Sequence, residues 1–182
     1  NLEAGVDFLL SSIKQNRRIC IYGDYDADGV NSISLLLEIL SHLTDNLTYY
    51  IPSRFDEGYG LNTDAIDHIK EQGSDLILTV DCGSVSREEV EYGKSVGMDF
   101  IVTDHHNIND RPADCILINP KQEDCSYPFK HLAGCGVAFK LAQGIQRKAG
   151  LPRSVLNGVL DLVAIATIGD IVPLLDENRT LV

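Results

Sequence analysis

Short apolar runs alternate with amphipathic segments along most of the chain. Apolar residues of the first segment recur at helical spacing, which predicts a helix over about residues 2–13. The same reasoning predicts further helices over about residues 29–42, 63–72 and 86–96. Between them, runs rich in β-branched and aromatic residues predict strands, at about residues 18–23, 47–52, 75–81, 99–106 and 115–120.

The predicted strands are nearly continuous apolar runs, which is typical of strands buried on both faces of a parallel sheet. From Leu132 to about Thr167 the chain is predicted to be helical, in two segments separated by Gly150-Leu151-Pro152. We therefore expect an α/β fold: an open, mainly parallel sheet of about five strands with helices on both faces and a helical C-terminal portion. No internal repeat or linker is visible, so residues 1–182 are predicted to form a single domain.

The chain has 182 residues and is 44% hydrophobic, which suffices for one domain with a substantial core. No apolar stretch approaches the length of a membrane span, and no signal peptide is visible. Because the sequence begins with Asn1, we expect a piece of a longer polypeptide. None of the five cysteines forms a C-x-x-C pair, which favours buried thiols in a reducing cytoplasm over disulfides or a zinc site.

The formal net charge of −12 argues against a broad basic face that grips nucleic acid. It leaves open a nucleic-acid substrate if cations fill an acidic site, or if another domain supplies the positive surface.

The stretch GDYDADG places Asp24, Asp26 and Asp28 at alternate positions directly after the first predicted strand. Carboxylates this close repel one another unless a positive charge lies among them, so the pattern favours a cation site over a plain turn. A calcium-binding EF-hand loop is excluded, because its twelfth position should be a glutamate and here is Leu35. An entering helix is also missing, since a strand precedes the motif.

Further candidate ligands end two other predicted strands. Asp81 ends the third strand, and Asp104, His105 and His106 end the fourth. Each has an ordinary alternative, because a strand-end Asp often caps the next helix and a lone His is often structural. The carboxyl ends of parallel strands meet at one edge of a sheet, so we expect these groups to converge.

The donor set indicates the metal. Oxygen-only sites suit Ca²⁺ or Mg²⁺, but an added imidazole moves the preference toward Mn²⁺ or a related transition ion. The absence of thiolates argues against structural zinc. One cation would leave part of this negative charge uncompensated, so we expect two ions. Paired ions roughly 3.5–4 Å apart are typical of enzymes that catalyse phosphoryl transfer. One more carboxylate is expected from LDLVAIATIGDIVPLL, where Asp170 is preferred to Asp161. Asp170 ends a buried run, and Gly169 can break the helix before it.

These motifs together resemble the DHH phosphoesterase superfamily, through GDYDADG, TVDCG, TDHH and the later Asp170. Three longer stretches, IPSRFDEGYGLN, YPFKHLAGCGVAFKLA and IGDIVPLLDENR, are similar to its RecJ branch of single-strand-specific DNA exonucleases. The resemblance extends from about residue 17 to residue 179.

The resemblance implies a Mn²⁺- or Mg²⁺-dependent hydrolase that acts 5′→3′ on single-stranded DNA in repair and recombination and releases 5′-mononucleotides. It implies that His106 faces the scissile phosphate and that Asp104 orients an imidazole. The implied metal ligands are Asp26, Asp28, Asp81, His105 and Asp170, with Asp24 either as an additional ligand or as a carboxylate that supports the ligands without touching the metal. The implied substrate-binding residues are Arg54, Gly134 and Gly136; alternatively, Arg54 pairs with Asp56 or Glu57, and the glycines serve helix packing.

Two departures from the family pattern matter. Some branches carry a histidine where this chain has Tyr22. RecJ proteins also have a second domain of the DHHA1 type and often an OB-fold, and neither is found in these 182 residues. We therefore expect the catalytic half here, with single-stranded DNA bound through the full-length protein, no membrane association, and any single-strand-binding or helicase partner unreadable from the sequence.

Three alternatives stay open at this point. One is a phosphodiesterase of the same superfamily for short oligonucleotides or cyclic dinucleotides. Another is a phospho-accepting receiver domain, in which Thr103 and Lys121 would take the roles of its later Thr and Lys, although it leaves the histidine pair unused. The third is an inactive scaffold that keeps the acidic site.

Overall fold

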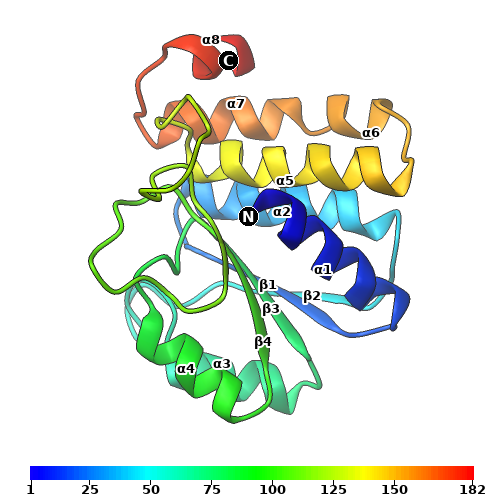
Figure 1. Cartoon of the computed structure of the whole chain (residues 1–182), viewed down its shortest axis with the longest axis vertical. Helices are drawn as coiled ribbons and strands as arrows, with labels where there is room; N and C mark the ends of the chain where they lie inside the picture. The colour runs from blue at the N-terminus through cyan, green and yellow to red at the C-terminus, as the bar shows by residue number, and fades with distance from the viewer.

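The computed structural model describes all 182 residues. Five parallel strands form one sheet in the order β2-β1-β3-β4-β5, and helices cover both of its faces (Figure 1). The predicted α/β fold with about five parallel strands is therefore confirmed. The strands are β1 (Ile19–Gly23), β2 (Leu47–Tyr50), β3 (Leu76–Val80), β4 (Asp99–Thr103) and β5 (Ile116–Ile118).

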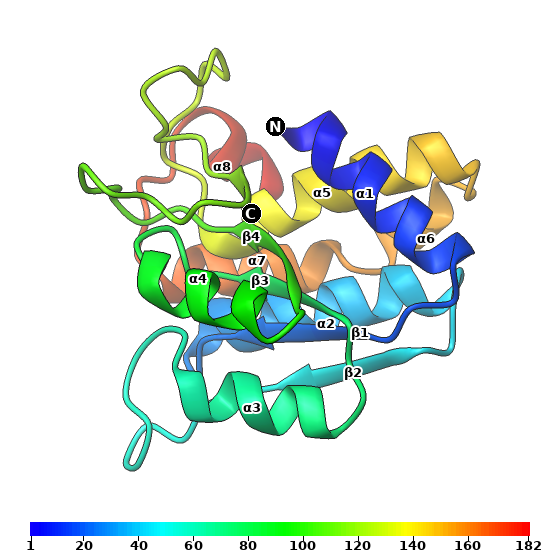
Figure 2. The same ribbon diagram turned by 60° about the horizontal axis from the view of Figure 1, so that its bottom comes forward.

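Each central strand is buried on both faces because alternate residues enter two separate cores. Ile21 and Leu78 belong to the larger core, which α1 (Leu2–Lys14), α2 (Ala27–Ser41) and α5 (Gly134–Ala149) cover. Tyr22 and Ile77 point to the opposite side, under α3 (Thr63–Glu71) and α4 (Arg87–Ser95). Figure 1 shows α3 and α4 together on the far side of the sheet from the other helices, and Figure 2 turns their end of the molecule forward. This double burial explains the uninterrupted apolar runs.

The helical C-terminal portion differs in detail from the prediction of two segments. The chain leaves α5 at Gly150, whose φ of +72° is the left-handed geometry favoured at helix ends. Two helices follow instead of one, α6 (Ser154–Asn157) and α7 (Leu160–Gly169), and α8 (Asp176–Leu181) ends the chain. The break between α6 and α7 lies at Gly158 and Val159. The apolar periodicity continues through this break, so the glycine is the only sign of it in the sequence.

The order in which the chain adds strands to the sheet reverses direction beside β1. From β1 the chain moves to β2 on one side and then returns to β3 on the other side. The segments that leave β1 and β3 diverge at such a point, which opens a crevice at the carboxyl edge of the sheet. Asp24 follows β1 and Asp81 follows β3, so both lie at this edge. None of the helices combines the length and the apolar character needed to cross a membrane.

Gly29 gives a test of how tightly the β1–α2 turn is built. A Cβ at this position would lie 2.3 Å from the backbone oxygen of Asp24, and a backbone atom cannot rotate away. We expect Gly29→Ala to lower the free energy of unfolding by about 1–3 kcal/mol, the usual cost of overpacking. Urea unfolding of the purified chain measures this.

Gly158→Ala is the matched control, because a Cβ there meets its nearest neighbour at an ordinary 3.7 Å. It should leave stability unchanged or raise it slightly, since alanine stabilises helical backbone relative to glycine. Equal effects of the two substitutions would show that the turn accommodates a side chain after all.

Candidate metal centre

Carboxylates and imidazoles from four segments converge where β1, β3 and β4 end and where α7 ends. Three groups of side chains bring one potential ligand atom each within 4.8 Å of the others. The groups share members and so form one continuous cluster. They are Asp24–Asp26–Asp81, Asp81–His105–His106 and Asp28–His105–Asp170.

The β1–α2 turn holds its three carboxylates in different ways. Asp24 Oδ1 accepts a hydrogen bond from the backbone N–H of Tyr25 at 2.7 Å. Asp26 is the N-cap of α2, and its Oδ1 accepts from the N–H of Gly29 at 2.9 Å. Asp26 therefore caps a helix, which is the ordinary alternative to metal binding for an aspartate at a strand end. Only Oδ1 of Asp26 takes part in the cap, so Oδ2 has no hydrogen bond to the protein.

Asp28 is fully buried in the first turn of α2 and is bound by the start of another helix. Its Oδ2 accepts from the N–H of Gly134 at 2.6 Å, and its Oδ1 accepts from the N–H of Cys135 at 2.7 Å. These amides belong to the first turn of α5, where the helix dipole favours a negative charge. Burial nevertheless outweighs them and raises the pKa of Asp28 to about 6.

Asp81 is the most strongly perturbed carboxyl of the cluster. It is buried and has a positive φ of 59° directly after β3, a conformation uncommon outside glycine. Burial, and then the nearby negative charges of Asp28 and Asp26, raise the pKa of Asp81 far above its ordinary value. A Cβ at position 134 would lie 2.6 Å from Asp81 Oδ1, so Gly134 leaves the space that this carboxylate occupies.

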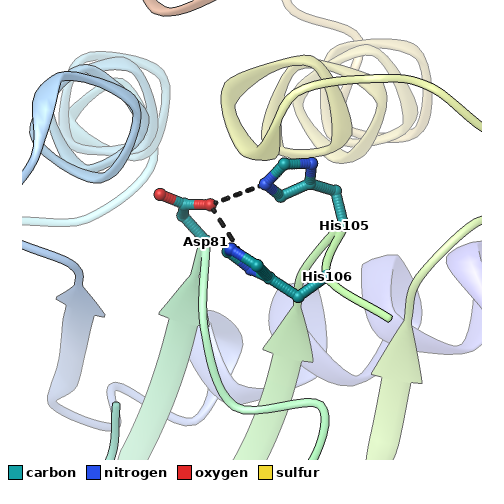
Figure 3. A group of neighbouring side chains, drawn as sticks. All are labelled: Asp81, His105 and His106. Atoms are coloured by element: carbon teal, nitrogen blue, oxygen red, sulfur yellow. Dashed lines mark ion pairs between the residues drawn. The ribbon is translucent and has the colours of Figure 1, made fainter. Parts of the chain in front are cut away.

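Asp81 and His105 face each other without forming a hydrogen bond. Asp81 Oδ1 and His105 Nε2 lie 3.2 Å apart, yet both atoms are buried and neither has a hydrogen-bond partner. Figure 3 shows the Asp81 carboxylate directed toward both imidazoles above the ends of the strands. Buried polar atoms are almost always satisfied, so this unpartnered pair marks the centre of the cluster.

Asp104 is the structural anchor of the histidine pair. Its Oδ1 accepts from His106 Nδ1 at 2.8 Å and from the backbone N–H of His105 at 2.7 Å. Its Oδ2 accepts from the N–H of Ser84 at 2.9 Å. Burial opposes ionisation of Asp104, but these hydrogen bonds and the His106 charge hold its pKa at about 2. The hydrogen bond to Asp104 in turn raises the pKa of His106.

The two adjacent histidines have different exposures. The His105 side chain is only 8% exposed and also lies 3.6 Å from Asp170 Oδ2. The His106 side chain is 45% exposed and lies at the surface of the cluster. His105 is thus placed among the carboxylates, whereas His106 is accessible to a molecule that approaches from solvent.

Asp170 joins the cluster because α7 ends at Gly169, one residue before it. Asp161 instead lies in the exposed first turn of α7, and its Oδ1 accepts from the next backbone N–H at 2.9 Å. The structure thus brings Asp170 to the candidate ligands and leaves Asp161 on the surface.

The predicted substrate-binding residues have distinct surroundings. The guanidinium of Arg54 lies over the ring of Tyr25, 4.5 Å from its centroid, and forms no ion pair with Asp56 or Glu57. A Cβ at Gly136 would contact the Leu132 side chain, as tight packing requires. Arg54 therefore lies beside the acidic turn, and Gly136 serves the packing of α5.

Two residues that the sequence analysis did not select hold the loops together. Asn119, buried after β5, donates from Nδ2 to Ser84 Oγ and to the backbone oxygen of His106, both at 2.9 Å. The Tyr59 hydroxyl lies 3.1 Å from His106 Nδ1 and donates to the backbone oxygen of Asp81 at 3.3 Å. Asn119 ends a strand at the ligand-bearing edge, so the reasoning applied to Asp81 would have found it; Tyr59 lies in a loop without such a signal.

Two of the residues considered in the sequence analysis have structural roles. The Tyr22 hydroxyl is buried and donates to the backbone oxygen of Gly60 at 2.8 Å, so it supports the loop before α3. Thr103 is also buried, and its hydroxyl donates to the backbone oxygen of Thr79 at 2.8 Å. The receiver interpretation, which needs Thr103 at the acidic site, therefore lacks support.

Comparisons of sequence and of structure both find similarity to exonucleases named RecJ. The exonuclease RecJ of Bacillus subtilis is 47% identical over 99% of the chain, and that of Escherichia coli is 40% identical over 99%. The chain spans only 22% and 33% of these relatives. A crystal structure of exonuclease RecJ bound to manganese superposes with a TM-score of 0.90 at 34% identity, over 99% of this chain and 46% of that one.

A second solved structure, RecJ of Thermus thermophilus in complex with Mn²⁺, superposes with a TM-score of 0.83 at 32% identity, over 99% of this chain and 26% of that one. The family model described as "DHH family, N-terminal domain" matches residues 18–167. This match includes the strands and loops that carry every acidic and histidine ligand candidate except Asp170. The chain belongs to the DHH family.

Proposed function

We propose that this chain is the catalytic part of a single-strand-specific DNA exonuclease that hydrolyses phosphodiester bonds with divalent metal ions. The observation that carries the proposal is the unpartnered pair of Asp81 Oδ1 and His105 Nε2, buried among further carboxylates. The support for the substrate comes from relatives that are named single-stranded-DNA-specific exonucleases. From the family resemblance we adopt 5′→3′ polarity and 5′-mononucleotide products.

The residues present fit Mn²⁺ or Mg²⁺, the ions named for RecJ structures. Oxygen donors dominate, one imidazole adds a nitrogen, and no thiol lies among the candidate ligands. A divalent ion held here would polarise a phosphoryl oxygen and acidify bound water. The proposed ligands are Asp24, Asp26, Asp28, Asp81, His105 and Asp170, enough for two ions.

We assign a separate role to His106. Its exposed imidazole is held by Asp104 at 2.8 Å, which fixes Nδ1 as the donor, while Nε2 lies 3.4 Å from the Tyr59 hydroxyl. The raised pKa of His106 favours the imidazolium form, which donates a hydrogen bond to an anionic phosphate oxygen. Arg54 lies beside the same turn and is proposed to contact a neighbouring phosphate.

We further propose that the positive DNA-gripping surface lies outside these residues. The net charge of −12 opposes tight binding of a polyanion, and the chain spans only 22% and 33% of two relatives. Large apolar side chains next to Asp170 are exposed, which indicates that another protein surface covers them; they are Ile165, Ile168, Ile171, Leu174 and Leu175. The free cysteines fit a reducing cytoplasm.

The first test concerns Asp81. Asparagine tolerates the positive φ at this position and keeps the shape of the side chain, so Asp81→Asn should fold. Removal of a charged ligand should weaken Mn²⁺ binding and slow cleavage of single-stranded DNA by about 100-fold or more, because even outer partners of metal ligands contribute 10–100-fold. Calorimetric titration of the chain and a strand-degradation assay of the protein at its natural length measure the two effects.

Asp161→Asn is the control, because it removes the same charge from the exposed first turn of α7. It should bind Mn²⁺ and cleave DNA as the unmodified chain does. Wild-type cleavage by Asp81→Asn in Mn²⁺ would refute the proposal, and faster cleavage of a dinucleotide than of a long strand would favour the short-oligonucleotide alternative.

The second test is the pH dependence of metal-free stability. Burial raises the pKa of Asp28 to about 6, and the pKa of Asp81 is raised further. Between the ordinary carboxyl pKa and these values the folded chain binds more protons than the unfolded chain, so stability falls as pH rises. The raised pKa of His106 acts in the same direction, because its contribution is complete below its ordinary pKa and is lost as pH rises through the raised pKa of the folded chain.

We therefore expect the thermal midpoint of the metal-free chain to fall between pH 5 and pH 8. Mn²⁺ should raise that midpoint more at pH 8, where fewer protons compete for the ligands. Asp81→Asn should flatten the metal-free profile. Identical profiles for the two proteins would show that Asp81 does not have the raised pKa. Differential scanning fluorimetry at constant ionic strength is sufficient.

The third test separates catalysis from DNA binding. These 182 residues alone should bind Mn²⁺ but bind a single strand no more tightly than roughly 1–100 μM at physiological salt, the range of non-specific electrostatic binding. Cleavage by the chain alone should be weak for the same reason. Fluorescence anisotropy with a labelled oligonucleotide measures the affinity, and nanomolar binding would contradict the proposed division.

A further inference from the structure

Asn119 is a buried polar side chain that belongs neither to the candidate metal ligands nor to the proposed phosphate contacts. It directly follows β5, and because Thr103 pairs with Ile118, it lies beside Asp104 at the carboxyl edge of the sheet. Only 2% of the residue is exposed. Buried polar groups are almost always hydrogen-bonded, so the partners of this amide show what it holds in place.

The amide of Asn119 connects the segments that follow three strands. Its Nδ2 donates to Ser84 Oγ and to the backbone oxygen of His106, both at 2.9 Å. Its Oδ1 accepts from the backbone N–H of Lys121 at 2.9 Å. The amide cannot rotate without leaving several buried groups unpaired, which is costly. Its position is therefore fixed relative to the ends of β3, β4 and β5.

The bond to His106 completes the attachment of that residue to the fold. Asp104 Oδ1 accepts from the backbone N–H and from the imidazole of His106, whereas Asn119 binds its carbonyl oxygen. Residues 107–112 form no helix or strand, and their one hydrogen bond lies within the segment. The next backbone hydrogen bond to the rest of the fold is made by Ala113. Asn119 thus holds His106 at the start of an otherwise weakly attached segment.

A second connection from Asn119 to His106 passes through Ser84. The hydroxyl of Ser84 accepts from Asn119, and its backbone N–H donates to Asp104 Oδ2 at 2.9 Å. Asp104 is the carboxylate that holds the His106 ring at 2.8 Å. One buried amide therefore acts directly on the main chain of His106 and, through one intermediate residue, on the group that orients its imidazole.

We propose that Asn119 is a positioning residue for His106, which keeps the imidazole in the one orientation that suits a phosphate undergoing hydrolysis. The inference rests on the proposed function, because the contact of His106 with phosphate is part of that proposal. Asn119 makes no hydrogen bond to a candidate metal ligand. Its removal should therefore slow hydrolysis, with little effect on the binding of Mn²⁺ or of DNA.

The experiment is a double-mutant cycle on the protein at its natural length, loaded with Mn²⁺ and supplied with single-stranded DNA. Asn119→Ala should lower kcat about 10–100-fold, as expected when a reacting group is slightly misplaced. KM and the Mn²⁺ affinity from calorimetric titration should stay nearly unchanged. In His106→Ala, which is slow by itself, adding Asn119→Ala should cause almost no further loss, because the imidazole that Asn119 positions is absent.

Asn119→Ser is a second variant with a smaller effect on folding. Its hydroxyl can accept from the Lys121 N–H and so keep the turn, but it is too short to bind Ser84 and His106 together. Asn119→Ser should therefore show the same loss of kcat as Asn119→Ala and the same dependence on His106.

Asn178→Ala is the matched control. Asn178 is also fully buried, and its Nδ2 donates to the backbone oxygens of His131 and Pro173 at 2.6 and 3.0 Å. Its substitution removes similar hydrogen bonds and should lower the thermal midpoint as Asn119→Ala does. It has no connection to His106, so any change that it causes in kcat should be the same factor with and without the His106 imidazole.

The possible outcomes separate the inference from the proposed function. An equal loss of kcat from Asn119→Ala with and without His106, a loss that appears mainly as weaker Mn²⁺ binding, or failure of both Asn119 variants to fold while Asn178→Ala folds would indicate a general structural role. Each would overturn the inference and leave the proposed function standing. Wild-type cleavage by His106→Ala would instead refute the proposed role of His106, and the inference with it.

Discussion

The structure depends on the burial of several carboxylates at one edge of a parallel sheet. Asp28 and Asp81 are nearly inaccessible to solvent; burial disfavours ionisation of both, and the charge of Asp28 further disfavours ionisation of Asp81. Protein groups offset only part of this cost, because the Asp81 and His105 atoms that face each other have no hydrogen-bond partner. Such an arrangement is stable at neutral pH when protons or cations supply the missing positive charge. The fold therefore makes metal binding and stability parts of the same equilibrium.

One pair of hydrogen bonds connects distant parts of the chain to this edge. The amides of Gly134 and Cys135 bind Asp28, so the start of α5 is fixed against the start of α2. Because α5 and α7 pack on α2 in the same core, this contact also helps to place the end of α7, where Asp170 enters the cluster. Position 134 has two roles: its backbone amide binds Asp28, and the absence of a Cβ leaves the space that Asp81 fills. The C-terminal helices thus complete the site as well as the core.

The sequence predicts the parts of this site that follow from strand ends. Asp24, Asp81 and His105 were located because apolar runs precede them and parallel strands share one carboxyl edge. The Gly134 amide could not be predicted as a partner of Asp28, because a backbone donor 106 residues away has no side-chain signature. Tyr59 was missed for a similar reason, since its loop has no period that fixes its direction. The sheet is thus predictable from local pattern, whereas contacts made by loops and helix ends depend on the assembled structure.

Under the proposed function, the adjacent histidines explain how an acidic chain acts on an acidic substrate. His105 is directed into the carboxylates, and His106 is directed outward with its charge favoured by Asp104. One strand end therefore serves both the proposed ion site and the proposed phosphate contact. Cations bound among the carboxylates would make the electrostatic potential positive within a few ångströms of the site. They would not reverse the net charge of −12 of the whole chain, whose effect salt screens beyond about one Debye length. The proposed function therefore separates local chemistry, assigned to these residues, from long-range attraction of DNA, assigned to other parts of the protein.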